Sequence, residues 1–250
     1  MVKLLILIGI ICAQSRENKE QNKERPCEEN PSEVFLLQWC YTFYMFRDRQ
    51  EAGRILAEEL FQYKDRDVIV YALPRGGVVL GYEIAKFLQA PLDLVITRKI
   101  GHPANPEYAI CAVTEKGEIF CNEKEKNLID ARWLDAEMQK EKKEMKRRRE
   151  IYLLGRERRS AKGKIAIVVD DGIATGLTIL AALSSLKKEQ PKELVVAVPV
   201  APHEFMGTLR ANADAAVVLQ DDPRYFGAVG AYYQNFPQVS DEEVIELLNS

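Results

Sequence analysis

Five short and nearly continuous apolar runs, separated by stretches with helical spacing, constrain the fold of this chain most. The runs are rich in β-branched residues and cover residues 67–73, 92–97, 164–169, 193–200 and 215–219. Such runs predict strands that are buried on both faces of a sheet. Helices are predicted over residues 47–63, 78–88, 177–188, 203–212 and 241–248. Alternating strands and helices predict an α/β fold, with an open, mainly parallel sheet and helices on both of its faces.

Three stretches interrupt this alternation. Residues 98–107 contain a glycine and two prolines, and they predict a loop. Residues 109–113 and 118–121 predict a short β-hairpin around Lys116-Gly117. Residues 123–160 are polar and helical in pattern, which predicts a helical insertion in the α/β domain.

A basic segment overlaps the end of this insertion. Between Lys140 and Lys164 there are twelve Lys or Arg residues and four Glu, a local balance of +8 in a chain whose net charge is −3. One interpretation is a solvated helix with many ion pairs between residues four apart. The other is a positive field over an anionic ligand, or a contact with RNA.

The first residues follow a different pattern. Lys3 precedes the apolar run Leu4–Cys12, which is too short to cross a bilayer as a helix. The run predicts an export signal, an extension from a misassigned start codon, or a real extra segment. We expect a poorly ordered N-terminal extension over residues 1–45 and a folded domain over residues 46–250, with no membrane partner.

Composition excludes several classes of protein. Two histidines in 250 residues argue against a zinc or iron site built from imidazoles. The five cysteines include no C-x-x-C pair, so we expect free thiols in a reduced, cytoplasmic protein.

The most informative motif is the run Val168–Thr178, VVDDGIATGLT. Two acids, Asp170 and Asp171, follow a buried strand, and a glycine-flanked turn then opens a helix. The amide groups of such a turn and the positive end of the helix dipole bind phosphate. Carboxylates beside the turn can accept hydrogen bonds from sugar hydroxyls. The run therefore predicts a site for a 5-phosphorylated ribose, against the simpler alternative of a helix cap and a tight turn.

This run resembles the phosphoribosyl pyrophosphate (PRPP) motif of the type I phosphoribosyltransferases. The resemblance implies that Asp170 and Asp171 hold the ribose hydroxyls, and contact Mg²⁺ mainly through PRPP and water. It also implies that the 5-phosphate is bound by Gly172, Ile173, Ala174, Thr175, Gly176 and Thr178.

Two further segments fit the same family. Pro74-Arg75-Gly76-Gly77 matches its pyrophosphate loop, in which Arg75 offers a charged fork and the glycines allow close approach of the backbone. Arg98 and Lys99 match a mobile loop whose basic residues reach the pyrophosphate.

The resemblance covers about residues 46–250 and extends to a subgroup of predicted phosphoribosyltransferases. The subgroup's patterns include DR-x-x-AG-x-x-LA at residues 48–57. Two positions depart from expectation. Cys111 stands where glycine is expected, and we expect it to pack as a small buried thiol. Ala174 stands where relatives that act on 6-oxopurines carry an acid, which argues against that chemistry.

The implied function is transfer of the 5-phosphoribosyl group from PRPP, with Mg²⁺, to a nitrogenous base-like acceptor, releasing pyrophosphate. Asp170, Asp171, Arg75 and Lys99 are the expected catalytic residues, and the rings of Tyr225 and Phe226 the expected acceptor contacts. A homodimer is expected. The competing hypothesis is a non-catalytic regulator that senses PRPP or a nucleotide and binds RNA through residues 140–164.

Overall fold

The computed structural model of the protein describes residues 45–154 and 156–250, apart from the side chains of Pro106 and Glu107. The expectations for the N-terminal extension lie outside the described residues. Residues Met45–Ser250 form one compact unit.

Five parallel strands form the central sheet, as the apolar runs predict. Their order is β2 (Leu92–Leu94), β1 (Val68–Ala72), β6 (Ile165–Val169), β7 (Glu193–Pro202) and β8 (Ala215–Asp222). Every residue of β1 and of β6 is buried, and the register pairs Val68 with Ile165. The apolar runs are continuous because these strands are covered on both faces.

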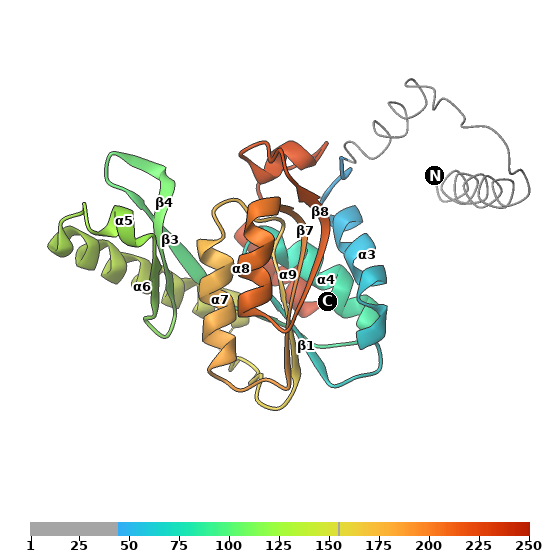
Figure 1. Ribbon diagram of the computed structural model, residues 1–250. Helices are drawn as coiled ribbons and strands as arrows, with labels where there is room; N and C mark the ends of the chain where they lie inside the picture. The colour runs from blue at the N-terminus through green and yellow to red at the C-terminus, as the bar shows by residue number, and fades with distance from the viewer. Residues whose placement is uncertain (1–44, 155) are drawn as a thin grey trace, which may run out of the picture. The chain divides into compact units, whose positions relative to one another are not determined.

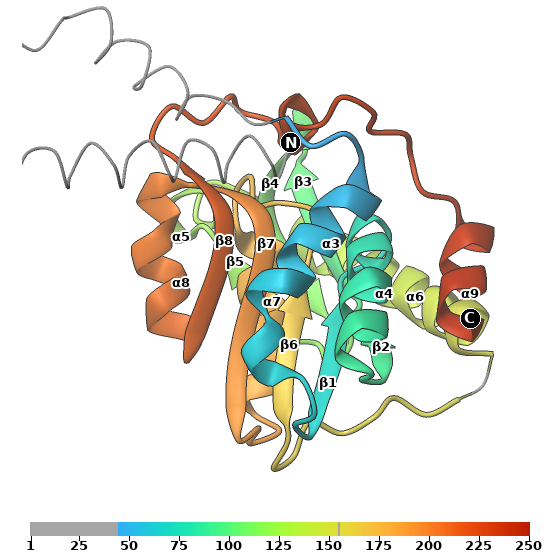
Figure 2. The ribbon, with the colours of Figure 1, turned by 90° about the vertical axis from the view of Figure 1, so that its right-hand side faces the viewer.

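Helices cover both faces of this sheet, as Figures 1 and 2 show. On one face lie α3 (Arg49–Glu59), followed by a 3₁₀ turn (Phe61–Tyr63), and α4 (Gly76–Leu88). On the other lie α7 (Leu177–Lys187) and α8 (Met206–Asn212), which the 3₁₀ turn His203–Phe205 precedes.

Each face has its own apolar core. Alternate residues of β1 enter opposite cores, so that Val70 packs with Leu80 and Ile84, whereas Tyr71 packs with Leu183 and Leu186. Full burial of one such leucine or isoleucine stabilises the fold by about 1.5–3 kcal/mol. The open parallel sheet with helices on both faces is confirmed.

The loop predicted for residues 98–107 is wrong. This stretch belongs to a separate antiparallel sheet of β3 (Thr97–His102), β4 (Asn105–Thr114) and β5 (Ile119–Cys121). Figure 1 shows this sheet, in green, beside the central one. Glycine and proline are tolerated in strands at a sheet edge or at a bulge. Strand β3 is an edge strand, and the β3–β4 register shifts around Gly101.

The expectation of free thiols is wrong for Cys111 and Cys121, which form a disulfide. The β4–β5 register places these residues directly opposite each other. Cys111 is fully buried, as expected, but it is half of a cystine rather than a thiol. Because disulfides persist mainly in oxidising compartments, these two residues no longer support a reduced environment.

The helical insertion consists of α5 (Glu123–Lys126) and the long helix α6 (Ala131–Leu153), and residues 156–164 are not helical. The end of α6 packs on α9 (Asp241–Asn249), where Met145 and Tyr152 join Val244 in one core cluster. Ser240 caps α9 by accepting a hydrogen bond from the Glu243 amide. A last 3₁₀ turn, Val229–Tyr232, precedes the C-terminal segment.

Candidate functional site

The site lies where the strand order of the central sheet reverses. From β1 the chain moves outward to β2, whereas from β6 it moves in the other direction to β7 and β8. In open parallel sheets, ligands bind at such a switch point, beyond the carboxyl ends of the strands. Helix α4 begins just after β1, and α7 just after β6. The pyrophosphate-loop and phosphate-loop motifs therefore occupy neighbouring strand ends.

Neither of these two helices has a side-chain cap. Arg75 and Gly176 are the N-cap residues of α4 and α7, and neither makes a capping hydrogen bond. Gly76 and Gly77, which match the pyrophosphate loop in the sequence, are the first residues of α4. The first amide groups of a helix need an outside acceptor, and an anion is a suitable one.

A cavity of about 180 Å³ lies at the start of α7. Its lining residues are Lys99, Ala109, Asp170, Gly172, Ile173, Ala174, Thr175, Gly176, Thr178, Ile179 and Val229. The fold thus brings together one acid, the whole predicted phosphate loop, and Lys99 from β3. Strand β3 of the antiparallel sheet, rather than a free loop, carries Lys99 to this cavity.

The glycine at position 176 is required by the backbone. Its φ is +75°, and a Cβ at this position would lie 2.0 Å from the ring of Phe205. A side chain here would therefore clash and would strain the backbone at the point where the loop enters α7. This local requirement fixes the shape of the loop.

The two acids are half-buried beside each other. The Asp171 amide donates a hydrogen bond to Asp170 Oδ1 over 2.9 Å. Burial raises the pKa of Asp170, and the neighbouring Asp171 carboxylate raises it further. Burial also raises the pKa of Asp171, although the Arg49 guanidinium opposes that rise.

Sequence reasoning missed the partner of Asp171. Arg49 Nε lies 2.8 Å from Asp171 Oδ2, and the two side chains are 10% and 17% exposed. The Tyr233 hydroxyl donates to the backbone carbonyl of Asp171 over 2.6 Å. Arg49 belongs to the family pattern at residues 48–57, but nothing local in that pattern indicates a contact 122 residues away.

The pyrophosphate-loop motif packs against the acids. A Cβ on Gly76 would lie 1.9 Å from Asp171 Oδ2, and one on Gly77 would lie 2.8 Å from the Val169 carbonyl. The Pro74–Arg75 peptide is cis. The close approach of the two motifs therefore depends on the missing side chains of the two glycines.

Arg75 does not line the cavity. It forms an ion pair with Asp241 over 3.7 Å and is 35% exposed. Asp241 also accepts a hydrogen bond from Tyr152 and pairs with Arg147. The hydrogen bond from Tyr152, together with Arg147 and Arg148, holds the pKa of Asp241 below its usual range. Arg75 is thus held by a carboxylate at the start of α9, which the sequence did not reveal.

Arg98 is directed elsewhere. Its Nε lies 2.6 Å from the Glu141 carboxylate of α6. Successive residues of a strand point to opposite faces, so Arg98 and Lys99 cannot both face the cavity. The structure brings only Lys99 to it.

The two predicted acceptor residues lie after β8. Tyr225 stacks on Tyr232, with ring centroids 5.5 Å apart, and its buried hydroxyl has no hydrogen-bond partner among the described residues. Burial, with smaller effects of Tyr232 and then Asp171, raises the pKa of Tyr225 to about 12. Phe226 is 53% exposed.

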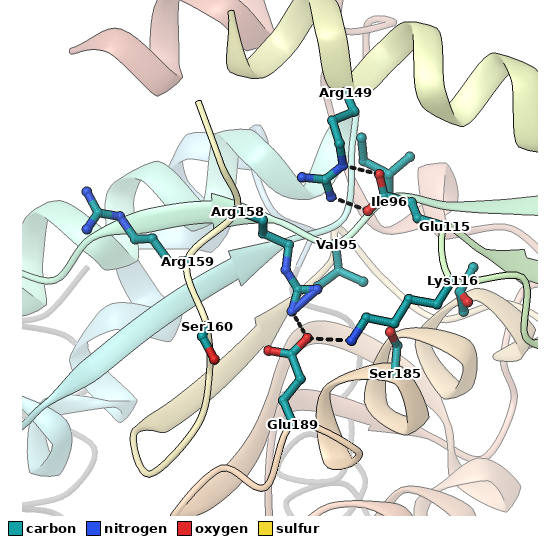
Figure 3. Close-up of a pocket in the computed structure, with 11 residues that line it drawn as sticks. Val95, Ile96, Glu115, Lys116, Arg149, Arg158, Arg159, Ser160, Ser185 and Glu189 are labelled. Carbon is teal, nitrogen blue, oxygen red and sulfur yellow. Dashed lines mark hydrogen bonds and ion pairs between the residues drawn. The ribbon is translucent and has the colours of Figure 1, made fainter. Parts of the chain in front are cut away.

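A larger cavity, of about 450 Å³, lies elsewhere and contains none of the predicted site residues. In Figure 3, Arg149 points to Glu115, while Arg158 and Lys116 converge on Glu189. The cations of this cavity are thus largely neutralised by their own carboxylates.

The basic segment shows the same behaviour. Within the described part of the chain, seven of its twelve cations pair with carboxylates: Lys140, Lys146, Arg147, Arg148, Arg149, Arg158 and Lys164. Four of these pairs lie within α6, as expected for a solvated helix, whereas Arg149, Arg158 and Lys164 pair with carboxylates outside it. The described residues include no cluster of three His, Cys, Asp or Glu that could hold a metal, and no helix among them is long and apolar enough to cross a bilayer.

This arrangement, with acids and two uncapped helices at a switch point, is typical of α/β proteins that bind phosphorylated ligands. A family model described as "Phosphoribosyl transferase domain" matches residues 47–233. The chain therefore belongs to the phosphoribosyltransferase family.

Two similar proteins match this chain over most of its length. The chain is 42% identical over 207 residues to "Putative phosphoribosyl transferase Rv0571c" of Mycobacterium tuberculosis H37Rv, a match that covers 82% of this chain. It covers 46% of that relative, so this chain spans about half of the relative's length. The crystal structure of TT1426 from Thermus thermophilus is 41% identical, with a TM-score of 0.68, and the match covers 82% of this chain and 98% of TT1426.

Proposed function

We propose that this protein binds PRPP together with Mg²⁺ and transfers the 5-phosphoribosyl group to a nitrogen of a base-like acceptor. In this reaction the bond from C1 of the ribose to pyrophosphate breaks, and its electron pair leaves with pyrophosphate. The lone pair of the acceptor nitrogen forms a new bond to C1, and the proton that this nitrogen carried is released to solvent. The observation that carries the proposal is the meeting of the acid pair with two uncapped helix N-termini at the switch point.

The 5-phosphate fits the cavity at the start of α7. Loop residues 172–176 line it, and the Thr178 side chain adds a hydroxyl donor. Lys99 supplies a positive charge from strand β3. This combination of amides, a hydroxyl and one cation is suited to a phosphate dianion.

The acids act on the sugar. In the proposed complex, Asp170 and Asp171 accept hydrogen bonds from the two ribose hydroxyls. Their negative charge also stabilises the positive charge that develops on the ribose ring as pyrophosphate leaves. The start of α4, with Arg75 released from Asp241 or shared with it, meets the pyrophosphate.

The acid pair fits Mg²⁺ in one specific manner. Two adjacent carboxylates are too few for a cage built only from protein, and Mg²⁺ commonly takes one or two carboxylates plus phosphate oxygens and waters. Bound in that way, it would neutralise charge on the leaving pyrophosphate.

Acceptor recognition is assigned to the segment after β8. Phe226 offers an exposed ring for stacking, and Tyr225 has a buried hydroxyl without a partner among the described residues. Ala174 leaves the phosphate loop without an acid, so no side chain is assigned as a general base.

We also propose that the protein acts in the cytoplasm as a homodimer. Cell fractionation tests the location, and light scattering tests the oligomeric state.

The deciding experiment measures PRPP binding by calorimetry with Mg²⁺ and then pyrophosphate release over a broad panel of bases. The double variant Asp170→Asn with Asp171→Asn is the comparison. We expect binding to wild type, release with at least one base, and a large loss of affinity in the double variant with a folded circular-dichroism spectrum. Binding without release from any base would instead support the nucleotide-sensing regulator. Equal affinity in wild type and double variant would contradict the site.

A further inference from the structure

Arg49 is the one buried arginine or lysine in the part of the chain that the structure describes, with 8% of its surface exposed. It begins α3, and its side chain reaches Asp171 across 122 residues of sequence. A cation is buried at a cost unless it is paired and hydrogen-bonded. Its contacts therefore show what this position requires.

Three contacts hold the guanidinium of Arg49. Its Nε donates to Asp171 Oδ2 over 2.8 Å, and its Nη1 donates to the Pro237 carbonyl over 2.6 Å. Its flat face lies 3.6 Å from the ring centroid of Phe236. Three contacts in three directions fix the group more tightly than a surface ion pair would.

These contacts leave the acid half occupied. Asp171 gives Oδ2 to Arg49, whereas Oδ1 makes no hydrogen bond or ion pair with another of the described residues. The Asp171 side chain keeps 17% of its surface exposed. Gly76 bounds Oδ2 on a further side, because a Cβ there would overlap that oxygen. One oxygen is thus fixed and the other is available to a ligand.

We infer that Arg49 is a positioning residue for the ribose site. It holds Asp171 by Oδ2 so that Oδ1 faces the sugar hydroxyls, and it ties this acid to the C-terminal segment 233–237 through Phe236 and Pro237. Arg49 itself touches no substrate in this scheme. The inference deepens the proposed function and rests on it.

Lysine cannot replace arginine in this role. Its ammonium is a point charge without a planar fork, so it cannot hold Asp171 and Pro237 while stacking on Phe236. Arg49→Lys therefore keeps the charge and removes the geometry. The matched control is Arg54→Lys on the same helix. Arg54 is 52% exposed, and its ion pair with Glu83 is long, at 3.6 Å.

The test is a double-mutant cycle on PRPP affinity, measured by calorimetry with Mg²⁺ on Arg49→Lys, Asp171→Asn and the combined variant. Loss of a charge-assisted hydrogen bond predicts that Arg49→Lys weakens binding about 10-fold or more, whereas Arg54→Lys stays within about 2-fold. Because Arg49 acts through Asp171, adding Arg49→Lys to Asp171→Asn should change affinity no further. A purely structural role would lower the unfolding temperature and give independent, multiplying losses of affinity.

Each result of this experiment supports or contradicts the positioning role of Arg49. Wild-type affinity in Arg49→Lys, or losses that multiply, would overturn the positioning role while leaving the proposed function intact. No PRPP binding by the wild-type protein would overturn the proposed function and this inference with it. If Arg49→Lys fails to fold, Phe236→Leu replaces it, because it removes the ring under the guanidinium and keeps the charge. A loss of several-fold that vanishes in the Asp171→Asn background is then expected, and wild-type affinity would overturn the inference.

Discussion

Replacing Gly76 by alanine tests whether the two motifs at the switch point form one site. Gly76 opens α4, and its missing side chain faces the acid of the other motif. An added Cβ would lie 1.9 Å from Asp171 Oδ2, 2.7 Å from its Cγ and 3.0 Å from Arg49 Nε. The substitution therefore acts on Asp171 without changing any charge.

The size of the displacement follows from these distances. Side-chain carbons essentially never approach another heavy atom closer than 3.0 Å, so the carboxylate must retreat by about 1.1 Å or more. The 2.8 Å hydrogen bond to Arg49 then breaks or bends, because Arg49 is held independently by Pro237. A lost charge-assisted hydrogen bond costs about 1.5–3 kcal/mol, which corresponds to roughly 10- to 100-fold in affinity. We expect PRPP affinity to fall about 10- to 100-fold.

Calorimetry with PRPP and Mg²⁺ measures this loss, and Gly207→Ala is the control. Gly207 lies in α8, and a Cβ at that position meets no atom within 4 Å. Alanine there is expected to leave affinity unchanged and to stabilise the helix by about 0.5–1 kcal/mol. Equal PRPP affinity in Gly76→Ala and wild type would refute the assignment of both motifs to one site.

Three further predictions concern groups around the site. Tyr233→Phe removes the donor to the Asp171 carbonyl, so the free energy of unfolding in urea should fall by about 1–3 kcal/mol, and an unchanged value would contradict this. Hydrogen bonding to Arg147 is the main cause that lowers the pKa of Glu144 from 4.5 to about 2, so the stability it contributes is complete above 4.5 and lost as pH falls toward 2. The stability difference between Glu144→Gln and wild type should therefore narrow below about pH 4.5, and a constant difference would exclude this mechanism. Lys99→Met should weaken PRPP binding about 10-fold with less effect at high salt, whereas wild-type affinity would remove Lys99 from the phosphate site.

The central sheet could be predicted because burial on both faces leaves a direct record in the sequence. A strand such as β1, with every residue buried, has no polar position to interrupt its apolar run. The strand, loop and helix of residues 168–178 could be predicted equally well, because strand, acids, glycines and helix follow one another there, while the phosphate-binding role of the loop stays a prediction. Local geometry of this kind needs no knowledge of distant contacts.

The antiparallel sheet of β3, β4 and β5 shows where local sequence signals mislead and where they allow a further prediction. Glycine and proline suggested a loop over residues 98–107, yet pairing with β4 outweighs those preferences. The disulfide, in contrast, could have been found. A hairpin turning at Lys116 pairs positions equally distant from that residue, and Cys111 and Cys121 each lie five residues from it.

The held acid could not have been predicted, because its partners come from both ends of the domain. Arg49 stands near the start of the folded unit, and Tyr233 and Pro237 stand near its end, yet all three bear on the region of Asp171. No pattern in a single sequence states such a contact. Its physical consequence is that the motif after β6 becomes a complete site only when α3 and the C-terminal segment have both docked against it. The geometry of Asp171 therefore depends on the whole fold, whereas the glycine-rich loop beside it is shaped largely by its own residues.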